Sequence, residues 1–406
     1  MRCVVLCATL AALLPLPAGA QSLLLSEADV LTRVSTESPR VRAIRAATDV
    51  VRAEALSARR WPNPVFTVDR ESVAGVTEYL TMVGQPLPIT GRRSLEIRSA
   101  DTLIAASTAR SEDLLRRARA DVRIAYAQLI AAQTRERALI EARDRLRELA
   151  AILARRETAG DAAGFDRLRA EREVSDIEAD FGAIATERAR AQATIAAYFA
   201  DRVDPSVIVA STPPPPPAVL PGVDALVDRA LMARGEFVAL EKERDAARLT
   251  AQAADRRRIP EPEIIAGTKS STLGGGDIGS VVTVVAIVPL FDRGKAERAL
   301  AEARARQAEA QADALRLTVR ADIAALRAAV LERRETAARY RTSAVSGANE
   351  IDRVARVSYD AGERGILELL DAYRAGSSAR IRQATLDLAT RQAEIELEFV
   401  SGWEIR

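Results

Sequence analysis

Histidine is absent from the 406 residues of this chain, and its only cysteines are Cys3 and Cys7. Histidine is the commonest general base and metal ligand in proteins, so its absence argues against most hydrolytic and metal-dependent chemistry. Both cysteines lie in a segment that we expect to be removed, so we expect neither a disulfide nor a thiolate metal site afterwards. Aromatic residues are only 4% of the chain. This composition suits long helices packed as coiled coils better than one large compact core.

An excess of charge of either sign is also missing. There are 59 Lys and Arg against 57 Asp and Glu, and loss of Arg2 leaves 58 against 57. This balance does not favour a nucleic-acid partner. The glycine run 274–276 lies between two predicted strands and opens no helix, so it is a poor phosphate loop. We expect no enzyme activity and no cofactor.

The first twenty residues have the pattern of a secretory leader. Arg2 is the basic start, Val4–Leu16 is the apolar stretch, and Ala18–Ala20 is a small-residue cleavage site. An anchor helix is the alternative, but the apolar stretch is too short to cross a bilayer comfortably. We predict cleavage near Gln21. Nothing after it approaches the roughly 20 apolar residues of a transmembrane helix.

Three sequence motifs occur twice, in the same order. The echoed pairs are Arg59–Pro64 with Arg257–Pro262, Pro86–Arg92 with Pro289–Lys295, and Ala159–Gly160 with Ala361–Gly362. Their spacings of 198, 203 and 202 residues predict a duplicated structural unit. The predicted divisions are a leader over 1–20, a first repeat over 21–206, a proline-rich linker over 207–222 and a second repeat over 223–406. We interpret the five consecutive prolines as an extended spacer.

Each repeat is predicted to contain a helix, a β-hairpin and then two long helices. In the first repeat we expect a helix over 26–60 broken near Pro39, strands at 65–68 and 78–83, and helices over 92–158 and 165–199. In the second we expect a helix over 223–258, strands at 263–269 and 278–288, and helices over 294–359 and 366–400. Heptad spacing at Leu115, Val122 and Leu129 and at Leu139, Leu146 and Leu153 indicates helix-on-helix packing.

Together these motifs resemble the TolC-like outer membrane efflux family over essentially the whole chain after the leader. The resemblance is carried by the duplicated unit, by Gln85–Arg93 and Val288–Lys295 after the hairpins, and by Tyr359–Gly362 followed by Ile366–Ala372. The opening Asn63–Phe66 and the exit Gln85–Arg93 look most like the branch that serves heavy-metal cation pumps.

The resemblance implies a mostly α fold with a small β part, in a homotrimer in the outer membrane of a Gram-negative bacterium. Each chain would give four β-strands to a shared transmembrane β-barrel, since small barrels need about eight. The long helices would form an α-helical coiled-coil barrel in the periplasm. Substrate, metal cations in that branch, would arrive from an inner-membrane pump of the resistance-nodulation-division type through a periplasmic adaptor. The alternative is a soluble periplasmic coiled-coil adaptor or scaffold with surface hairpins.

The candidate functional residues follow from this plan. Glu368 and Asp371 lie three apart on one helix face, and the resemblance places them at a tunnel constriction as carboxylate rings. An ordinary solvated helix face is the alternative. The periplasmic tip turns are Gly160, Gly164, Gly362 and Gly365. The strand–helix joints, beside outer-membrane lipid in the family, are Pro62, Pro64, Pro86, Pro88, Gly91, Pro260, Pro262, Pro289 and Gly294.

Overall fold

The computed structural model describes residues 22–34, 38–160, 164–211 and 219–403. The chain divides into two compact units. Unit 1 is Met1–Ser35, Val122–Pro214 and Arg339–Leu388, and unit 2 is Thr36–Asp121, Pro215–Ala338 and Ala389–Arg406. Each unit therefore draws on both predicted repeats. The leader and the proline run 213–217 lie outside the described residues, and the repeat boundaries stay a prediction.

The helices of unit 2 repeat one burial pattern. They are α2 (Pro39–Arg59), α5 (Val223–Ala233), α6 (Gly235–Asp255), α7 (Lys295–Tyr340) and parts of α3 (Arg92–Thr158) and α9 (Ile366–Ser401). In α2 the fully buried residues are Val41, Thr48 and Ala55. In α6 they include Ala239, Ala246 and Ala253, each 198 positions later. The first sequence echo is therefore also an echo in packing.

The main core of unit 2 joins α5, α7 and the end of α9. Leu226, Val319, Ile323, Val330 and Leu397 are buried in it, and Leu315 and Leu326 pack against its side. The stripe expected from the four-four-three-four spacing along α7 therefore faces this core.

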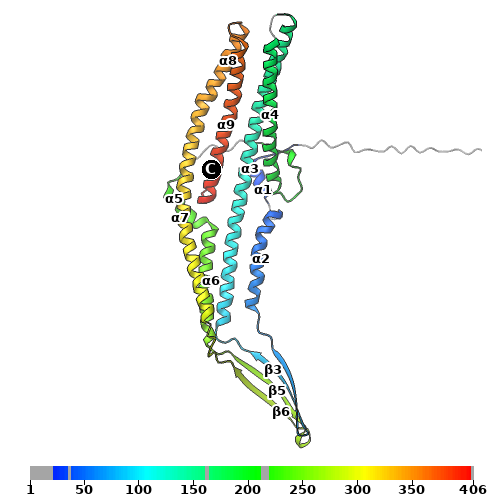
Figure 1. The fold of residues 1–406 in the computed structure, drawn as a ribbon. Helices are drawn as coiled ribbons and strands as arrows, with labels where there is room; N and C mark the ends of the chain where they lie inside the picture. The colour runs from blue at the N-terminus through cyan, green and yellow to red at the C-terminus, as the bar shows by residue number, and fades with distance from the viewer. Residues whose placement is uncertain (1–21, 35–37, 161–163, 212–218, 404–406) are drawn as a thin grey trace, which may run out of the picture. The chain divides into compact units, whose positions relative to one another are not determined.

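Unit 2 also carries a four-stranded antiparallel sheet, which follows directly on its helices (Figure 1). Its strands are β2 (Val65–Val73), β3 (Val76–Pro86), β5 (Pro262–Ser271) and β6 (Ile278–Ala286), paired in that order. β2 and β3 are joined by a two-residue turn, in which Ala74 and Gly75 have φ of 51° and 82°. Positive φ at both positions matches the right-handed twist of a hairpin. The strands are longer than predicted in the first hairpin.

Unit 1 is built from paired helices. It contains α1 (Glu27–Arg33), α4 (Gly164–Ala196), α8 (Ser346–Asp360), the remainder of α3 and the first part of α9. The predicted heptad residues Val122, Leu129, Leu139, Leu146 and Leu153 are all at most 3% exposed. Two short strands that we did not predict, β1 (Leu23–Leu25) and β4 (Ile208–Ala210), pair in parallel.

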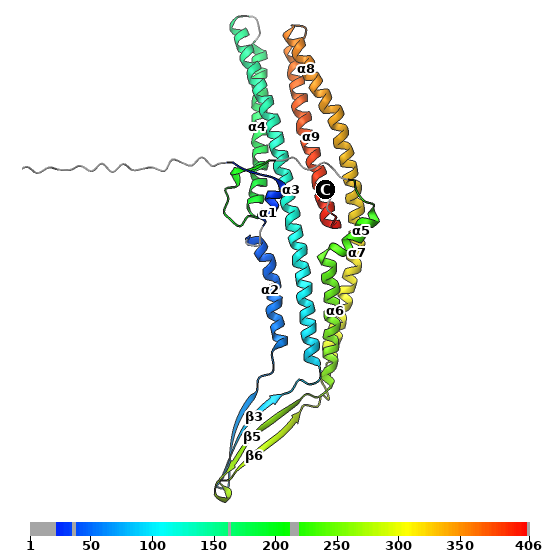
Figure 2. The same ribbon diagram turned by 180° about the vertical axis from the view of Figure 1, so that it is seen from behind.

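Two predicted helices are interrupted. The helix expected over 223–258 is broken at Arg234, whose ψ of 117° is extended, and Gly235 then opens α6. A Cβ at Gly235 would collide with the carbonyl oxygen of Ala109, and the Gly235 amide donates to Asp113 (3.2 Å). The helix thus breaks where it lies tightly against α3. Figure 2 shows α5 and α6 as separate helices beside α7.

The helix expected over 294–359 contains a π-helical segment, Arg341–Val345. Ser343 donates its hydroxyl to the carbonyl of Arg339 (2.7 Å), which is the kind of side-chain competition that loosens a helix locally. Short 3₁₀ turns complete the fold at Pro205–Val207, Arg256–Arg258 and Leu273–Gly275.

Candidate functional site

The four-stranded sheet has one apolar face. Residues paired directly across an antiparallel sheet share a face, and successive residues alternate between faces. The row Phe66, Val83, Ala266 and Val282 therefore defines one side. The exposed large apolar residues on this side are Phe66, Val68, Tyr79, Val83, Ile264, Ile278, Val282 and Val284. We call this side the apolar face; its only charged residue is Arg70.

The opposite side, which we call the polar face, collects the charges of the sheet. It holds Asp69, Glu71, Glu78, Glu263 and Lys269. Lys269 and Glu78 form an ion pair across two strands (2.6 Å). The exposed apolar residues on this side, Val65, Val73 and Val285, lie at or next to strand ends. The sheet thus separates apolar from charged side chains although both faces are accessible.

Two glycines on the polar face lie where β3 and β5 approach closely. A Cβ at Gly267 would collide with the backbone of Thr81 and Met82, and a Cβ at Gly84 would collide with Glu263. Glycine inside a strand commonly marks a close backbone approach or a bend. The polar face is therefore the crowded, inner side of a curved sheet, and the apolar face is its outer side.

Both sets of predicted joints lie between helices and strands. Pro62 and Pro64 precede β2 and Pro260 precedes β5, while Pro262 is the first residue of β5 and Pro86 the last of β3. Pro88 and Pro289 lie in the segments that lead to α3 and α7. Gly91 and Gly294, with φ of 78° and 74°, directly precede those helices. The left-handed backbone at these two positions favours glycine because it has no Cβ.

The two predicted tip turns have the same geometry. Gly160 and Gly362 follow α3 and α8 with φ of 77° and 73°. Their amides donate to Glu157 and Tyr359 (3.0 Å each). Glu363 closes the second turn with a further bond to Ser358 (2.9 Å), which completes a Schellman cap. Gly164 is the first residue of α4, and Gly365 precedes α9.

The acidic pair lies on the exposed face of α9. The opposite face buries Ile366, Leu369, Leu370 and Tyr373 in the main core of unit 1, which also holds residues from α3, α4 and α8. Glu368 and Asp371 point away from this core and are exposed. Burial raises the pKa of the Tyr373 phenol, the largest influence on that group. Four packed side chains therefore fix the helix that carries the two free carboxylates.

Ion pairs that we did not predict link the helices next to this core. Arg374 of α9 binds Glu173 of α4 in a bidentate pair, and this hydrogen bonding raises the pKa of Arg374. Arg145 of α3 binds Asp352 of α8 (2.7 Å). The arginines and acids are common on helices of this composition, so the sequence held no signal for which of them would pair.

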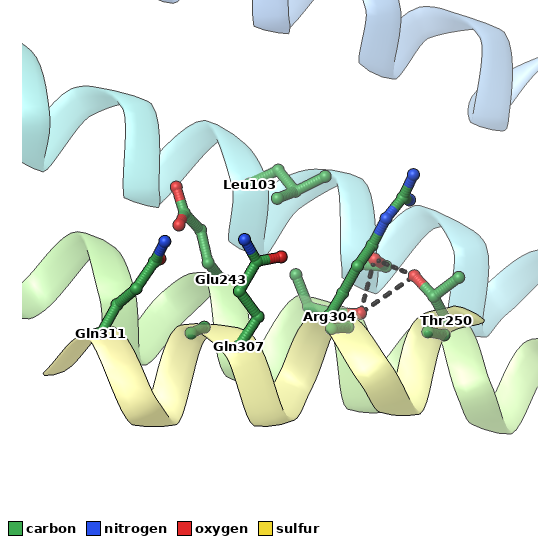
Figure 3. Close-up of a pocket in the computed structure, with 11 residues that line it drawn as sticks. Leu103, Glu243, Thr250, Arg304, Gln307 and Gln311 are labelled. Atoms are coloured by element: carbon green, nitrogen blue, oxygen red, sulfur yellow. Dashed lines mark hydrogen bonds between the residues drawn. The ribbon is translucent and has the colours of Figure 1, made fainter. Parts of the chain in front are cut away.

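A groove of about 330 Å³ lies between α3, α6 and α7 in unit 2 (Figure 3). Leu103, Glu243, Thr250, Arg304, Gln307 and Gln311 line it together with small residues. Ser99 donates to the carbonyl of Ala246 (2.9 Å) and bonds Thr250 (2.9 Å) in its floor, and Glu243 is paired with Arg110 (2.9 Å). These bonds hold α3 to α6, and no nucleophile and base face each other there.

Two general searches of the described residues add to this picture. None of the helices in the ranges given above is both long and apolar enough to cross a membrane. The same ranges contain no group of three or more His, Cys, Asp or Glu side chains arranged to hold a metal ion.

Comparison with solved structures shows the fold. The chain is similar to CusC (TM-score 0.76, 14% identity, 97% of this chain and 96% of that one). It is similar to the outer membrane protein VceC of Vibrio cholerae (0.73, 15%, 94% and 97%). It also resembles the open state of the outer membrane channel MtrE of Neisseria gonorrhoeae (0.73, 17%, 93% and 88%). The fold is therefore that of TolC-like channels, as expected.

Comparison with sequence families gives the same result. No curated protein sequence matches the chain. Residues 226–402 match the model of the outer membrane efflux protein family, and this stretch falls within the second predicted repeat. With both hairpins and all the long helices arranged as in outer-membrane channels, the chain belongs to the outer membrane efflux protein family.

Proposed function

We propose that three copies of this chain form the outer-membrane channel of a tripartite efflux system. The four strands of each copy give a shared barrel of twelve strands, and the helices give a passage on the periplasmic side. A periplasmic adaptor and an inner-membrane pump deliver the substrate. The observation that carries this proposal is the sheet with one apolar face, one charged face and two edge strands.

The faces of the sheet support a lipid-facing outside and a water-filled inside. Spanning strands alternate apolar residues towards lipid with polar residues towards the lumen, and about 9–11 residues cross the bilayer. β2, β3, β5 and β6 have 9, 11, 10 and 9 residues. The curvature towards the charged face also agrees with a charged interior. A soluble scaffold would gain nothing from eight large apolar side chains exposed on one side of a sheet.

Glu368 and Asp371 are proposed as the groups that select charge in the passage. Their face of α9 is free while the other face is packed. Three copies would give two rings of three carboxylates, and such rings favour cations. A cationic substrate, including metal ions, fits these rings, with the choice among cations left to the pump.

The tip turns at Gly160 and Gly362 are proposed as the surface that meets the adaptor. Both are exposed, and both hold a left-handed cap that fixes where one helix ends and the next begins. The tip is thus a rigid feature with little side-chain bulk.

The experiment has two parts. Outer-membrane fractionation and heat-modifiable migration of the purified protein test the channel directly, and recovery in the soluble periplasm would support the scaffold instead. In planar bilayers, the double variant Glu368→Ala with Asp371→Ala is expected to lose cation preference and to leak more. The matched control is Asp360→Ala with Glu363→Ala, which removes the same charge from exposed positions just before α9. Equal selectivity in both double variants would rule out the acidic rings.

A further inference from the structure

The outer edge of β6 is shaped for pairing with another strand. Exposed edge strands are normally protected by charges, prolines or short length. From Ile278 to Val288 the chain contains no charged residue and no proline. Val282 and Val284 on one face are 74% and 67% exposed, and Val285 on the other is 42% exposed. Within the described part of the chain, β6 pairs only with β5.

The chain contains a template for the missing pairing. The seam between β3 and β5 joins the hairpin of the first repeat to the hairpin of the second, with Pro86 opposite Glu263. Beyond the strands, the Leu87 amide donates to the carbonyl of Pro262 (2.9 Å). We call this contact between the two halves of one sheet the internal seam.

The internal seam also has a polar latch. Glu261 accepts a hydrogen bond from the Thr90 hydroxyl (2.7 Å) and another from the Arg92 guanidinium (3.0 Å). These groups lie in the segments just outside the strands, so the latch holds the start of α3 against the start of β5.

The sequence echoes say which residues would form the corresponding seam between two copies. Pro64 stands 198 positions before Pro262, so β2 takes the place of β5. Pro289 stands 203 positions after Pro86, so β6 takes the place of β3. Pro86 opposite Glu263 then becomes Pro289 opposite Val65.

We infer that β6 of one copy pairs antiparallel with β2 of the next copy, in the register of the internal seam. This inference rests on the proposed channel and names the residues that join its subunits. Val284 lies opposite Arg70 of the next copy, and Val282 lies opposite its Ser72. The contact is head to tail, so it closes into a ring when the rotation between copies allows.

The transferred register passes a test that it need not have passed. On β6 and on β2 the apolar face carries the even-numbered residues, whereas on β3 it carries the odd-numbered ones and on β5 the even-numbered ones. A register moved by an even number would therefore have placed apolar residues opposite polar ones, because a slip of one residue exchanges the faces. The two echo spacings, 198 and 203, differ by an odd number. The apolar face is continuous across the inferred seam.

The inferred seam lacks the latch. Asn63 occupies the position of Glu261, and Lys295 occupies that of Arg92. The cation is kept and the carboxylate is lost. Asn63→Glu should restore the pair with Lys295 of the next copy and raise the temperature at which the trimer separates. Asn63→Gln is the control of equal size without charge.

Cysteine cross-linking tests the register, because Cys3 and Cys7 are the only natural cysteines. The full chain with Val284→Cys and Arg70→Cys, oxidised in outer membranes, should shift from a one-chain to a three-chain band on non-reducing gels after heating. Within one copy these positions are separated by β3 and β5, roughly 14 Å at about 4.8 Å per strand, too far for a disulfide. Val284→Cys with Asp69→Cys is the matched control, since Asp69 lies on the other face.

The outcomes separate this inference from the channel itself. A three-chain band for the first pair and none for the control supports the register. Heat-modifiable trimers in the outer membrane that give equal bands for both pairs, or no band for either, overturn the register and leave the channel standing. Protein recovered only as soluble single chains overturns both.

Discussion

The two faces of the sheet make a sharp prediction about neighbouring residues. Val282 is the middle residue of β6 on the apolar face and Thr283 follows it on the polar face, and both are exposed. Arginine at either position changes the charge by the same amount at nearly the same depth. Only the face differs, so the pair Val282→Arg and Thr283→Arg isolates its effect.

The expected cost is large at one position and small at the other. An arginine that faces lipid near the bilayer midplane costs about 2–4 kcal/mol, whereas a lumen position tolerates charge. Three copies share one proposed barrel, so Val282→Arg carries a cost of roughly 6–12 kcal/mol per trimer. Thr283→Arg should be nearly neutral for assembly and should lower cation conductance through added positive charge in the lumen.

Heat-modifiable migration and outer-membrane yield, measured for both variants at equal expression, check this expectation. Val282→Arg should lose most of its trimer, and Thr283→Arg should keep it. Equal loss in both variants would mean that both faces meet the same environment, and normal trimer in Val282→Arg would mean that the apolar face does not meet lipid.

Two further predictions concern the helices. Gly362→Val forces a β-branched residue into φ of 73° and should abolish efflux while trimers remain in the membrane; Gly347→Ala, in open space within a helix, is the control, and normal efflux with Gly362→Val would refute a docking role for the tip. At the start of α1, hydrogen bonds from the Ser26 hydroxyl and amide lower the pKa of Asp29 below 3.8. Because the folded-state pKa is lowered, this stabilisation is present above pH 3.8 and is lost as the pH falls through the folded-state value. Hydrogen exchange at the Val30 amide should therefore accelerate at low pH more in the natural chain than in Asp29→Asn, and identical pH profiles would contradict this.

The long helices were predictable because their signals are local. The helix predicted over 92–158 matches α3 (Arg92–Thr158), since no proline or glycine interrupts its heptads and Gly160 ends it in a left-handed cap. The break between α1 and α2 was visible at Pro39, which is the first residue of α2. The break at Arg234 was not predicted, because its cause is the close approach of Gly235 to Ala109, 126 positions away. The parallel pairing of β1 with β4 is non-local in the same way.

The faces of the sheet were only half visible in the sequence. Alternation is imperfect because Leu80, Met82 and Val281 lie on the polar side, where they are partly buried. The pairing register resolved this, since it assigned each residue a row as well as a parity. Glu261 stood out in the sequence only as a difference from Asn63, and its latch with Arg92 became visible when both strands were placed.

The asymmetry between the repeats gives each copy of the unit a different task. At the start of α9 four side chains are buried in the core, and Glu368 and Asp371 stand opposite them. At the start of α4 the first repeat instead leaves Phe165 and Leu168 exposed, at 67% and 57%. A ring of charges can hold a constriction only if its helix is held in place, because each ordered side chain must overcome its own conformational entropy. The packing of α9 meets this condition and the start of α4 does not. The physical argument therefore places the selective carboxylates in the second repeat, and leaves the exposed apolar residues of the first repeat available for contact with another protein at the tip.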